Sequence, residues 1–270
     1  TIDGYSIGEK NIDNVNAGKT LFELYDLTGK EKYKKAADLV YSQIEIMPRC
    51  QNEARSFWHK DIYPNQVWLD GLYMGLPFYL EYETRYNDRK NYSDIFGQFK
   101  FVIENMRNPV NGLYFHAMDT SREAFWCDKV TGLSQHSWLR AIGWYTMALI
   151  DTLDQVDNKD HKYDAECKML EDAFKDLVDS MLKYQDESGM WYQVVNYGGM
   201  DTHFLRLYVL DIFLMIMRSM PRKQSMVSVK DTLRLRKMVH YHLVVSVLLQ
   251  DLVVMEEDLV HMIIICQSQS

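Results

Sequence analysis

Hydrophobic side chains recur at helical spacing along the first two hundred residues of the chain. In the first such segment Val15, Leu21, Phe22 and Leu24 fall on one side, and a following Thr28-Gly29 pair is a helix stop signal. The next segment repeats the pattern after Lys30, so the two predict a helical hairpin. The same spacing predicts helices over residues 13–25, 30–46, 67–83, 92–106, 138–153 and 163–184.

Strand-like alternation is absent from residues 1–200, and polar or glycine-containing loops separate the predicted helices. Tryptophans concentrate in these loops. Repeated hairpins with aromatic loops are typical of an all-α toroid of paired helices, whose loops build a pocket at one end. The alternative is a stack of helical repeats that serves as an interaction scaffold, although no fixed repeat period is visible.

Composition narrows the class of protein. The 270 residues carry a formal net charge of -8 and are 47% hydrophobic, which predicts a soluble globular chain and no nucleic-acid partner. No uncharged apolar run reaches the length of a membrane span, and no signal peptide opens the chain, so we expect a cytoplasmic protein without a membrane partner. The chain begins at Thr1 without Met, and we expect that a leading segment has been trimmed. The four cysteines match neither a zinc site nor a disulfide framework and are expected to be reduced thiols.

The first candidate site lies at the predicted start of a helix, where aromatic and polar residues are dense between Phe57 and Gly75. Aromatic faces and amide or acid groups suit sugar recognition. The Trp68-Leu69-Asp70 sequence is central to this cluster. The structural alternative is that it merely caps the helix and anchors it in the core.

A second cluster runs from Gly112 to Trp144. Asp128 follows Trp126 and Cys127, and burial beside these residues would raise its pKa, as a general acid near neutral pH requires. The alternatives are structural: Arg140 simply pairs with a carboxylate, and His116 is a satisfied loop histidine.

A third cluster follows the last predicted helix. Trp191 and Gln193 lie two residues apart and would line the same side of an extended loop. The alternative is a buried loop anchor.

The stretches WLDGLYMG, GLYFHAMD, WCDKVTGLS, SWLRAIGWYTMALID and GMWYQVV occur in this order. Together they resemble the landmarks of the unsaturated rhamnogalacturonyl hydrolases of glycoside hydrolase family 105, which are related to the unsaturated glucuronyl hydrolases of family 88. The resemblance covers about residues 5 to 205. Two motifs depart from the family pattern: Ser134-Gln135-His136-Ser137-Trp138 stands where the family has Ser-Pro-x-Phe-Trp, and His116-Ala117-Met118-Asp119 stands where it has His-Ala-Trp-Asp. We expect these changes to affect the substrate more than the reaction.

The resemblance implies an (α/α)6 barrel of helical hairpins and an enzyme that removes the 4,5-unsaturated uronic acid from lyase-cut pectin (rhamnogalacturonan) fragments. The reaction hydrates the vinyl ether, needs no metal or organic cofactor, and takes a small oligosaccharide such as an unsaturated disaccharide. Asp128 matches the family's catalytic acid and Asp70 its second acid. The expected substrate-binding residues are His116, Trp126, Arg140, Trp144, Trp191 and Gln193. An inactive or sugar-binding relative is the alternative function, and the oligomeric state stays open.

The character of the sequence changes near Arg206. Glycine does not occur after Gly199, and Met, Val and Leu accumulate. If each codon is rebuilt from the last base of one residue's codon and the first two of the next, residues 261–270 can encode Tyr-Asp-Tyr-Tyr-Met-Ser-Glu-Pro-Val, which resembles the closing motif of the family; the Asp is forced by Met262-Ile263. We therefore expect residues 1–205 to form the hydrolase domain and residues 206–270 to be an out-of-frame tail that leaves the barrel incomplete.

Overall fold

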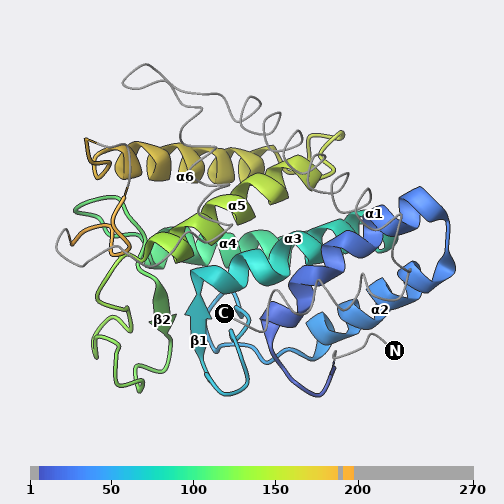
Figure 1. Cartoon of the computed structure of the whole chain (residues 1–270), viewed down its shortest axis with the longest axis horizontal. Coiled ribbons are helices and arrows are strands. Elements are labelled where there is room, and N and C mark those ends of the chain that lie inside the picture. The colour runs from blue at the N-terminus through green and yellow to red at the C-terminus, as the bar shows by residue number, and fades with distance from the viewer. Residues whose placement is uncertain (1–5, 188–190, 198–270) are drawn as a thin grey trace.

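The computed structural model describes residues 6–187 and 191–197. It opens with a 3-10 helix, η1 (Ile12–Gly18). The α-helices are α1 (Lys19–Thr28), α2 (Glu31–Ile46), α3 (Leu69–Tyr86), α4 (Tyr92–Asn105), α5 (Leu139–Gln155) and α6 (Asp164–Leu182) (Figure 1). These elements confirm the six predicted helical segments, with most boundaries shifted by one to three residues and the first segment divided between η1 and α1.

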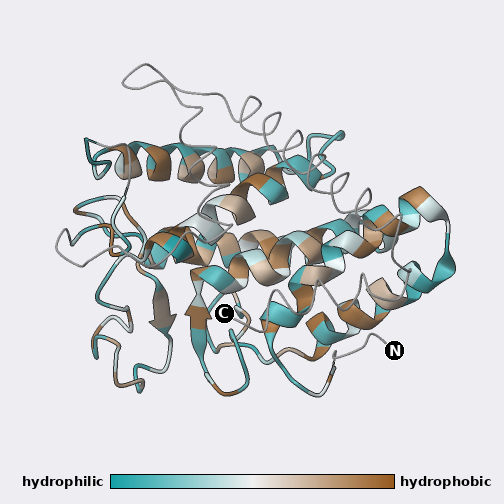
Figure 2. Ribbon diagram, viewed as in Figure 1, coloured by the Kyte–Doolittle hydropathy of each residue, from teal (hydrophilic) through white to brown (hydrophobic). Residues whose placement is uncertain are grey.

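Within the described residues the α-helices pair into three hairpins, α1–α2, α3–α4 and α5–α6, whose members pack against each other. The most extensive packing joins α3 to α5. Burial explains this arrangement, because α3 buries 13 of its 18 residues whereas α6 buries 7 of 19. Helices that are apolar on most sides belong in the centre, and amphipathic ones cover them. Figure 2 shows the corresponding concentration of hydrophobic residues along the central helices, with hydrophilic turns at the hairpin ends.

The 3-10 helix η1 lies directly on α3. Gly75 allows this close approach, because a Cβ atom at Gly75 would meet the Ile12 side chain at 2.8 Å. Ile12 is fully buried. The segment before α1 is thereby fixed against the first half of α3, next to the residues that begin that helix.

A short ribbon occupies the loop end of the central helices. Strands β1 (Gln66–Trp68) and β2 (Ala117–Asp119) pair antiparallel, with Trp68 opposite Ala117 and Gln66 opposite Asp119. The two strands have only three residues each, so the expectation of no core strand is confirmed for the described residues. β1 leads straight into α3 and holds the start of that helix beside the segment that precedes β2 (Figure 1).

A buried carboxylate holds the far end of α3. The Glu83 side chain is fully buried and accepts hydrogen bonds from the Tyr41 hydroxyl (2.7 Å), Asn87 Nδ2 (2.8 Å) and both the backbone N–H (2.8 Å) and Nδ2 (3.0 Å) of Asn91. Glu83→Ala leaves these donors without their acceptor, so we expect a loss of about 3 kcal/mol in the free energy of unfolding, measured by urea denaturation. The matched control is Glu104→Ala on the exposed side of α4, which should cost under about 1 kcal/mol. Equal losses in both variants would contradict this role for Glu83.

The described residues also bear on the expected fold class, the expected tail and the cysteines. The all-α class is confirmed, and the relation to the helical-barrel enzymes is taken up below with the solved structures. The predicted out-of-frame tail, 206–270, lies outside the described residues, as does Cys266. Cys50, Cys127 and Cys167 are free thiols.

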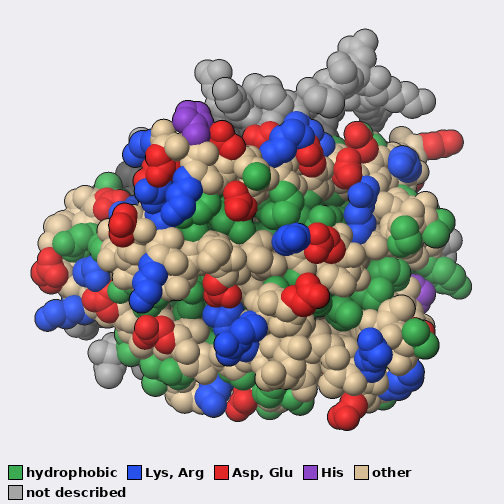
Figure 3. Space-filling model, turned by 180° about the vertical axis from the view of Figure 1, so that it is seen from behind, with side chains coloured by type: hydrophobic (Ala, Val, Ile, Leu, Met, Phe, Trp, Pro, Cys, Tyr) green, Lys and Arg blue, Asp and Glu red, His purple; other side chains and the backbone are tan. Residues whose placement is uncertain are grey.

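None of the described helices combines the length and apolarity that crossing a membrane demands. On the face shown in Figure 3, Lys and Arg side chains alternate with Asp and Glu.

Candidate active site

The N-terminal ends of the two central helices meet in an ion pair. Asp70 is the second residue of α3 and Arg140 the second residue of α5. Arg140 donates to Asp70 Oδ1 from Nε (3.1 Å) and from Nη2 (3.0 Å). Asp70 is 5% exposed, whereas the Arg140 side chain is 37% exposed. The pair therefore places a buried carboxylate beneath a guanidinium that still reaches solvent.

The second carboxylate oxygen of Asp70 meets a histidine. His116 Nε2 lies 3.2 Å from Asp70 Oδ2. Burial raises the pKa of Asp70, but the His116 hydrogen bond and charge, together with the Arg140 guanidinium, outweigh burial and hold the pKa below its usual range. Both carboxylate oxygens thus have donors, and a proton on His116 lies within hydrogen-bond reach of Asp70.

Aromatic rings surround His116. Its ring meets the Trp68 ring edge-on, with centroids 5.1 Å apart, and lies 6.4 Å from the Trp138 ring. Trp68 in turn stacks on His59 (4.5 Å) and on Tyr63 (5.2 Å). Such an aromatic wall beside a charged cluster suits a ligand with apolar C–H faces and polar edges, as a sugar ring has.

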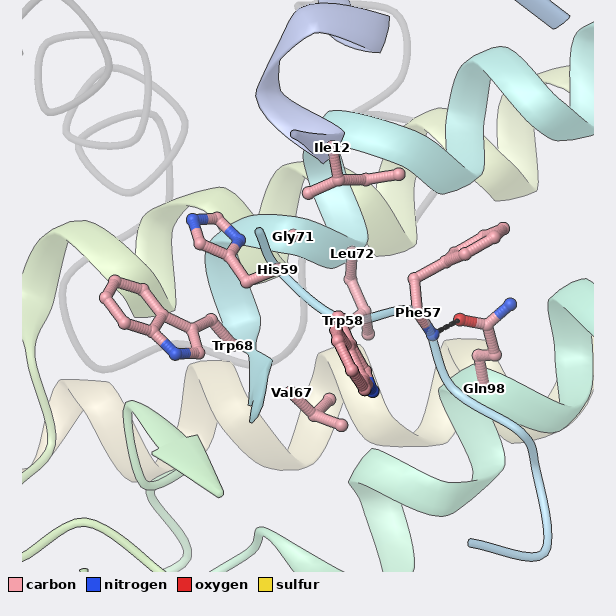
Figure 4. Close-up of a pocket in the computed structure, with 9 residues that line it drawn as sticks. All are labelled: Ile12, Phe57, Trp58, His59, Val67, Trp68, Gly71, Leu72 and Gln98. Atoms are coloured by element: carbon pink, nitrogen blue, oxygen red, sulfur yellow. Dashed lines mark hydrogen bonds between the residues drawn. The ribbon is translucent and has the colours of Figure 1, made fainter. Parts of the chain in front are cut away.

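A small pocket lies behind this wall, where η1, the loop before β1, the start of α3 and α4 meet (Figure 4). The His59 ring lies beside Trp68 in this view. His59 Nε2 lies 3.6 Å from Asp13 Oδ1, and Lys60 Nζ contacts Asp13 Oδ2 at 2.9 Å. Burial lowers the pKa of His59, although Asp13 opposes this effect. His59 is therefore a neutral support for Trp68. The sequence singles out the stretch from Phe57 to Gly75, which includes His59, as a candidate site. It assigns no role to His59 or to Asp13.

Trp144 extends the site along α5. It lies one helical turn after Arg140, and its ring stacks on Tyr73 of α3 with centroids 4.7 Å apart. Lys19 Nζ lies 3.5 Å from the centre of the same Tyr73 ring. The ring of half-buried Trp144 thus lies at the seam between the two central helices.

The expected raised pKa of Asp128 is wrong. Asp128 is exposed in the loop between β2 and α5, and its Oδ1 accepts from Val130 N (3.0 Å), Thr131 N (2.7 Å) and Thr131 Oγ1 (2.9 Å). The Thr131 and Val130 hydrogen bonds lower the pKa of Asp128, with little opposing burial. Cys127 is buried but its neighbour turns outward, so Asp128 is placed as the cap of its own turn.

For Trp191 the alternative of a buried loop anchor is confirmed. Trp191 is 5% exposed and its Nε1 donates to the Met181 carbonyl oxygen (2.7 Å), which makes it a buried anchor on the end of α6. Gln193 is half-buried, and its backbone carbonyl oxygen accepts a hydrogen bond from Leu139 N (2.8 Å) at the start of α5.

Trp126 is half-buried, and within the described residues no ring contact or hydrogen bond joins it to the Asp70 cluster.

Three site residues are thus brought together in one cluster: Asp70, His116 and Arg140. Trp144 lies next along α5, whereas Asp128 and Trp191 have structural partners of their own. Within residues 6–187 and 191–197 no group of His, Cys, Asp and Glu side chains is arranged to hold a metal ion.

Known proteins are similar to this chain in sequence and in fold. The model of Glycosyl Hydrolase Family 88 matches residues 3–203. The unsaturated rhamnogalacturonyl hydrolase YesR of Bacillus subtilis is 26% identical over 193 residues, which cover 69% of this chain and 52% of that protein. A protein of Agrobacterium fabrum is 33% identical over 127 residues, 47% of this chain and 52% of the relative. The chain therefore spans about half the length of the curated relatives it matches.

A solved structure agrees with both matches. The family 105 glycoside hydrolase of C. acetobutylicum is 41% identical, with a TM-score of 0.73 over 80% of this chain and 59% of that one. Its likeness relates the three described hairpins to the helical-barrel enzymes. Since the family model spans most of the sequence, the chain belongs to glycosyl hydrolase family 88.

Proposed function

We propose that the chain is a glycoside hydrolase that releases the 4,5-unsaturated uronic acid from lyase-generated rhamnogalacturonan fragments, with an unsaturated disaccharide as the smallest substrate. The observation that carries the proposal is the Asp70 carboxylate, buried at the junction of the two central helices and bonded to both Arg140 and His116. The Bacillus subtilis relative, an unsaturated rhamnogalacturonyl hydrolase, supports the substrate class.

The proposed reaction starts with protonation of C4 of the sugar's vinyl ether. Asp70 is ionised in the free enzyme because of its two partners. When the substrate's carboxylate approaches Arg140, it competes for the guanidinium and raises the pKa of Asp70. His116 in its imidazolium form then passes the Nε2 proton to Asp70 Oδ2 and becomes a neutral imidazole, and Asp70 delivers the proton to C4.

The positive charge that develops at C5 and the ring oxygen is quenched by water. Water adds its oxygen to C5 and returns a proton to the Asp70–His116 pair, which restores the starting protonation state. The bond between C5 and the ring oxygen of the hemiketal breaks, which gives a ketone at C5 and a hemiacetal at C1. The hemiacetal collapses to an aldehyde and releases the neighbouring sugar with its hydroxyl group. The side chains of Asp70 and His116 are needed only for the proton transfers and the addition of water, and the ring opening and the sugar release follow from the hemiketal.

In this proposal Asp70, rather than Asp128, is the proton donor to C4. A catalytic acid needs a proton held beside the substrate. The pKa of both carboxyl groups is lowered, so both are ionised in the free enzyme. Asp70 differs from Asp128 in having a histidine within hydrogen-bond reach that can supply the proton, whereas Asp128 is exposed and bonded only within its own turn. Trp68 and Trp144 are proposed as walls of the sugar pocket, and Trp126 as a loop residue beyond them.

The experiment follows the ultraviolet absorbance of an unsaturated rhamnogalacturonan disaccharide, which disappears with the double bond. We would assay the 270-residue chain and a version whose reading frame is restored after Leu205, since we propose that residues 206–270 are out of frame. We expect turnover by the restored chain and little by the 270-residue chain. No turnover by either would contradict the proposed function. A resequenced gene with an intact reading frame, and with stop codons in the shifted frame, would overturn the proposed frameshift.

We also propose a cytoplasmic location, which the free thiols Cys50, Cys127 and Cys167 support because the cytoplasm keeps thiols reduced.

A further inference from the structure

A series of contacts leads from η1 to the Asp70 carboxylate. Asp13, the second residue of η1, faces His59, with its Oδ1 atom 3.6 Å from His59 Nε2. The His59 ring stacks on Trp68 with centroids 4.5 Å apart and an interplanar angle of 5° (Figure 4). Trp68 meets the His116 ring edge-on at 5.1 Å, and His116 Nε2 lies 3.2 Å from Asp70 Oδ2. Three adjacent rings therefore join a carboxylate outside the Asp70 cluster to the proposed proton path.

Backbone hydrogen bonds hold η1 beside His59. Ile12 N donates to the His59 carbonyl oxygen (3.1 Å), and His59 N donates to the Gln66 carbonyl oxygen (2.9 Å). Asp13 N donates to the side chain of Asn11, which caps η1 (3.0 Å). None of these three bonds uses the Asp13 side chain, so that side chain can be replaced while the bonds remain.

The His59 ring has little room on the side of α3. His59 is 5% exposed, and a Cβ atom at Gly71 would lie 3.1 Å from His59 Nδ1. One face of the ring is covered by Trp68. A neutral imidazole favours the tautomer whose proton faces an acceptor, and the Asp13 carboxylate lies on the Nε2 side. Asp13 thus favours both the Nε2–H tautomer and the ring orientation that lies flat on Trp68.

Lys60 shares the same carboxylate. Its Nζ lies 2.9 Å from Asp13 Oδ2, whereas Oδ1 faces the imidazole. Burial lowers the pKa of His59, and Asp13 opposes burial only in part, because Lys60 lowers the pKa as well. A neutral His59 suits the proposed reaction, since a positive charge there would disfavour the imidazolium form of His116. Asp13 can therefore orient the ring without charging it.

We propose that Asp13 is a positioning residue that acts through the His59 ring. It holds that ring flat against Trp68, and the supported Trp68 edge keeps His116 Nε2 directed at Asp70. The inference rests on the proposed function, because the step that it assists is the transfer of a proton from His116 to Asp70. Asp13 makes no contact with the sugar in this proposal, so substrate binding should not depend on it.

The test replaces the Asp13 side chain and measures kcat and KM for the unsaturated disaccharide, at a temperature at which circular dichroism shows each variant folded. Asp13→Ala should lower kcat about tenfold and leave KM nearly unchanged, since a displacement of about 1 Å can cost up to about a hundredfold. Asp13→Asn keeps an oxygen that can accept from His59 Nε2 and should recover most of the lost kcat. Loss of kcat in Asp13→Asn equal to that in Asp13→Ala would overturn the inference.

Two control variants on the neighbouring loop separate the His59 contact from charge. Lys60→Ala removes the other partner of Asp13, and Asp61→Ala removes an exposed carboxylate next to it in sequence. Both should keep kcat within about twofold of the wild-type value, because partly exposed charges contribute little. An equal loss of kcat in Lys60→Ala would contradict a role through His59.

A double-mutant cycle tests whether Asp13 acts through His59. His59→Ala should lower kcat at least as much as Asp13→Ala does. Addition of Asp13→Ala to His59→Ala should then change kcat no further, because residues that act in series do not have additive effects. Additive losses in the double variant would overturn the inference.

A spectroscopic measurement tests the inference without turnover. The carbon-bound ring protons of His116 lie beside the Trp68 ring, whose ring current shifts their NMR signals. Asp13→Ala should move the His116 signals, whereas Asp61→Ala should leave them in place. If the wild-type chain turns over no disaccharide, the proposed function fails and this comparison alone decides whether Asp13 positions His116: moved signals support the inference, and unmoved signals overturn it.

Discussion

Asp70→Asn should reduce kcat by at least about a thousandfold, within the range by which general acid catalysis accelerates reactions. The amide keeps the shape of the carboxyl group but cannot pass a proton from His116 to C4 of the sugar. The amide also keeps an oxygen for Arg140, so substrate binding should change much less than kcat. The measurement is the rate of absorbance loss at saturating unsaturated disaccharide, together with KM.

The matched control is Asp128→Asn. It removes a carboxylate that is exposed and bonded only within its own turn, to Val130 and Thr131. We expect kcat to remain within about threefold of the wild-type value, because the turn lies outside the proton path and an Asn amide oxygen also caps turns. Full activity in Asp70→Asn and loss in Asp128→Asn would reverse the assignment.

Arg140→Ala should impair both function and stability. The carboxylate of Asp70 is almost fully buried, and loss of its guanidinium partner leaves the charge with His116 alone. Breaking a buried ion pair costs about 3 to 5 kcal/mol, and we expect about 2 to 3 here because the Arg140 side chain is 37% exposed. We also expect kcat/KM to fall at least about a hundredfold, since the substrate carboxylate loses its charged partner.

The stability loss in Arg140→Ala should depend on pH. Arg140 helps to depress the pKa of Asp70, so its contribution is present above the ordinary pKa of Asp and is lost as pH falls through the lowered folded value. Urea denaturation of the variant and the wild-type chain should therefore differ most near pH 7 and converge in acid. Arg140→Lys is the control that keeps the charge but not the paired contacts, and it should lose less stability than Arg140→Ala. A pH-independent difference would contradict electrostatic pairing as its source.

Helices were predictable from the sequence because their apolar spacing is local. The predicted segment 67–83 corresponds to α3, which begins at Leu69 because Gln66, Val67 and Trp68 pair with β2. That pairing joins residues about fifty positions apart, and neither three-residue strand has enough alternation to be seen on its own. Helix ends set by such long-range contacts were therefore missed by two residues.

The same difference between local signals and long-range contacts decides which features of the site were predictable. Asp70, His116 and Arg140 were each singled out from their motifs, but their contacts span 46 and 70 residues and became visible only in the fold. The expected burial of Asp128 is wrong, because its hydrophobic neighbours suggested a buried loop whereas its side chain is exposed. The sequence Asp128-Lys129-Val130-Thr131-Gly132 contains a turn signal instead, and Gly132 indeed has a φ of 80°. For Trp191 the alternative of a buried anchor was the correct one.

A crystal structure of the Asp70→Asn variant with the unsaturated disaccharide tests the central claim most directly. The account predicts that the sugar lies at the N-terminal ends of α3 and α5, with its C4 atom in contact with the substituted side chain at position 70. The carboxylate of the sugar should lie beside Arg140. A sugar bound instead at the Asp128 turn, with position 70 out of reach of the double bond, would contradict the account.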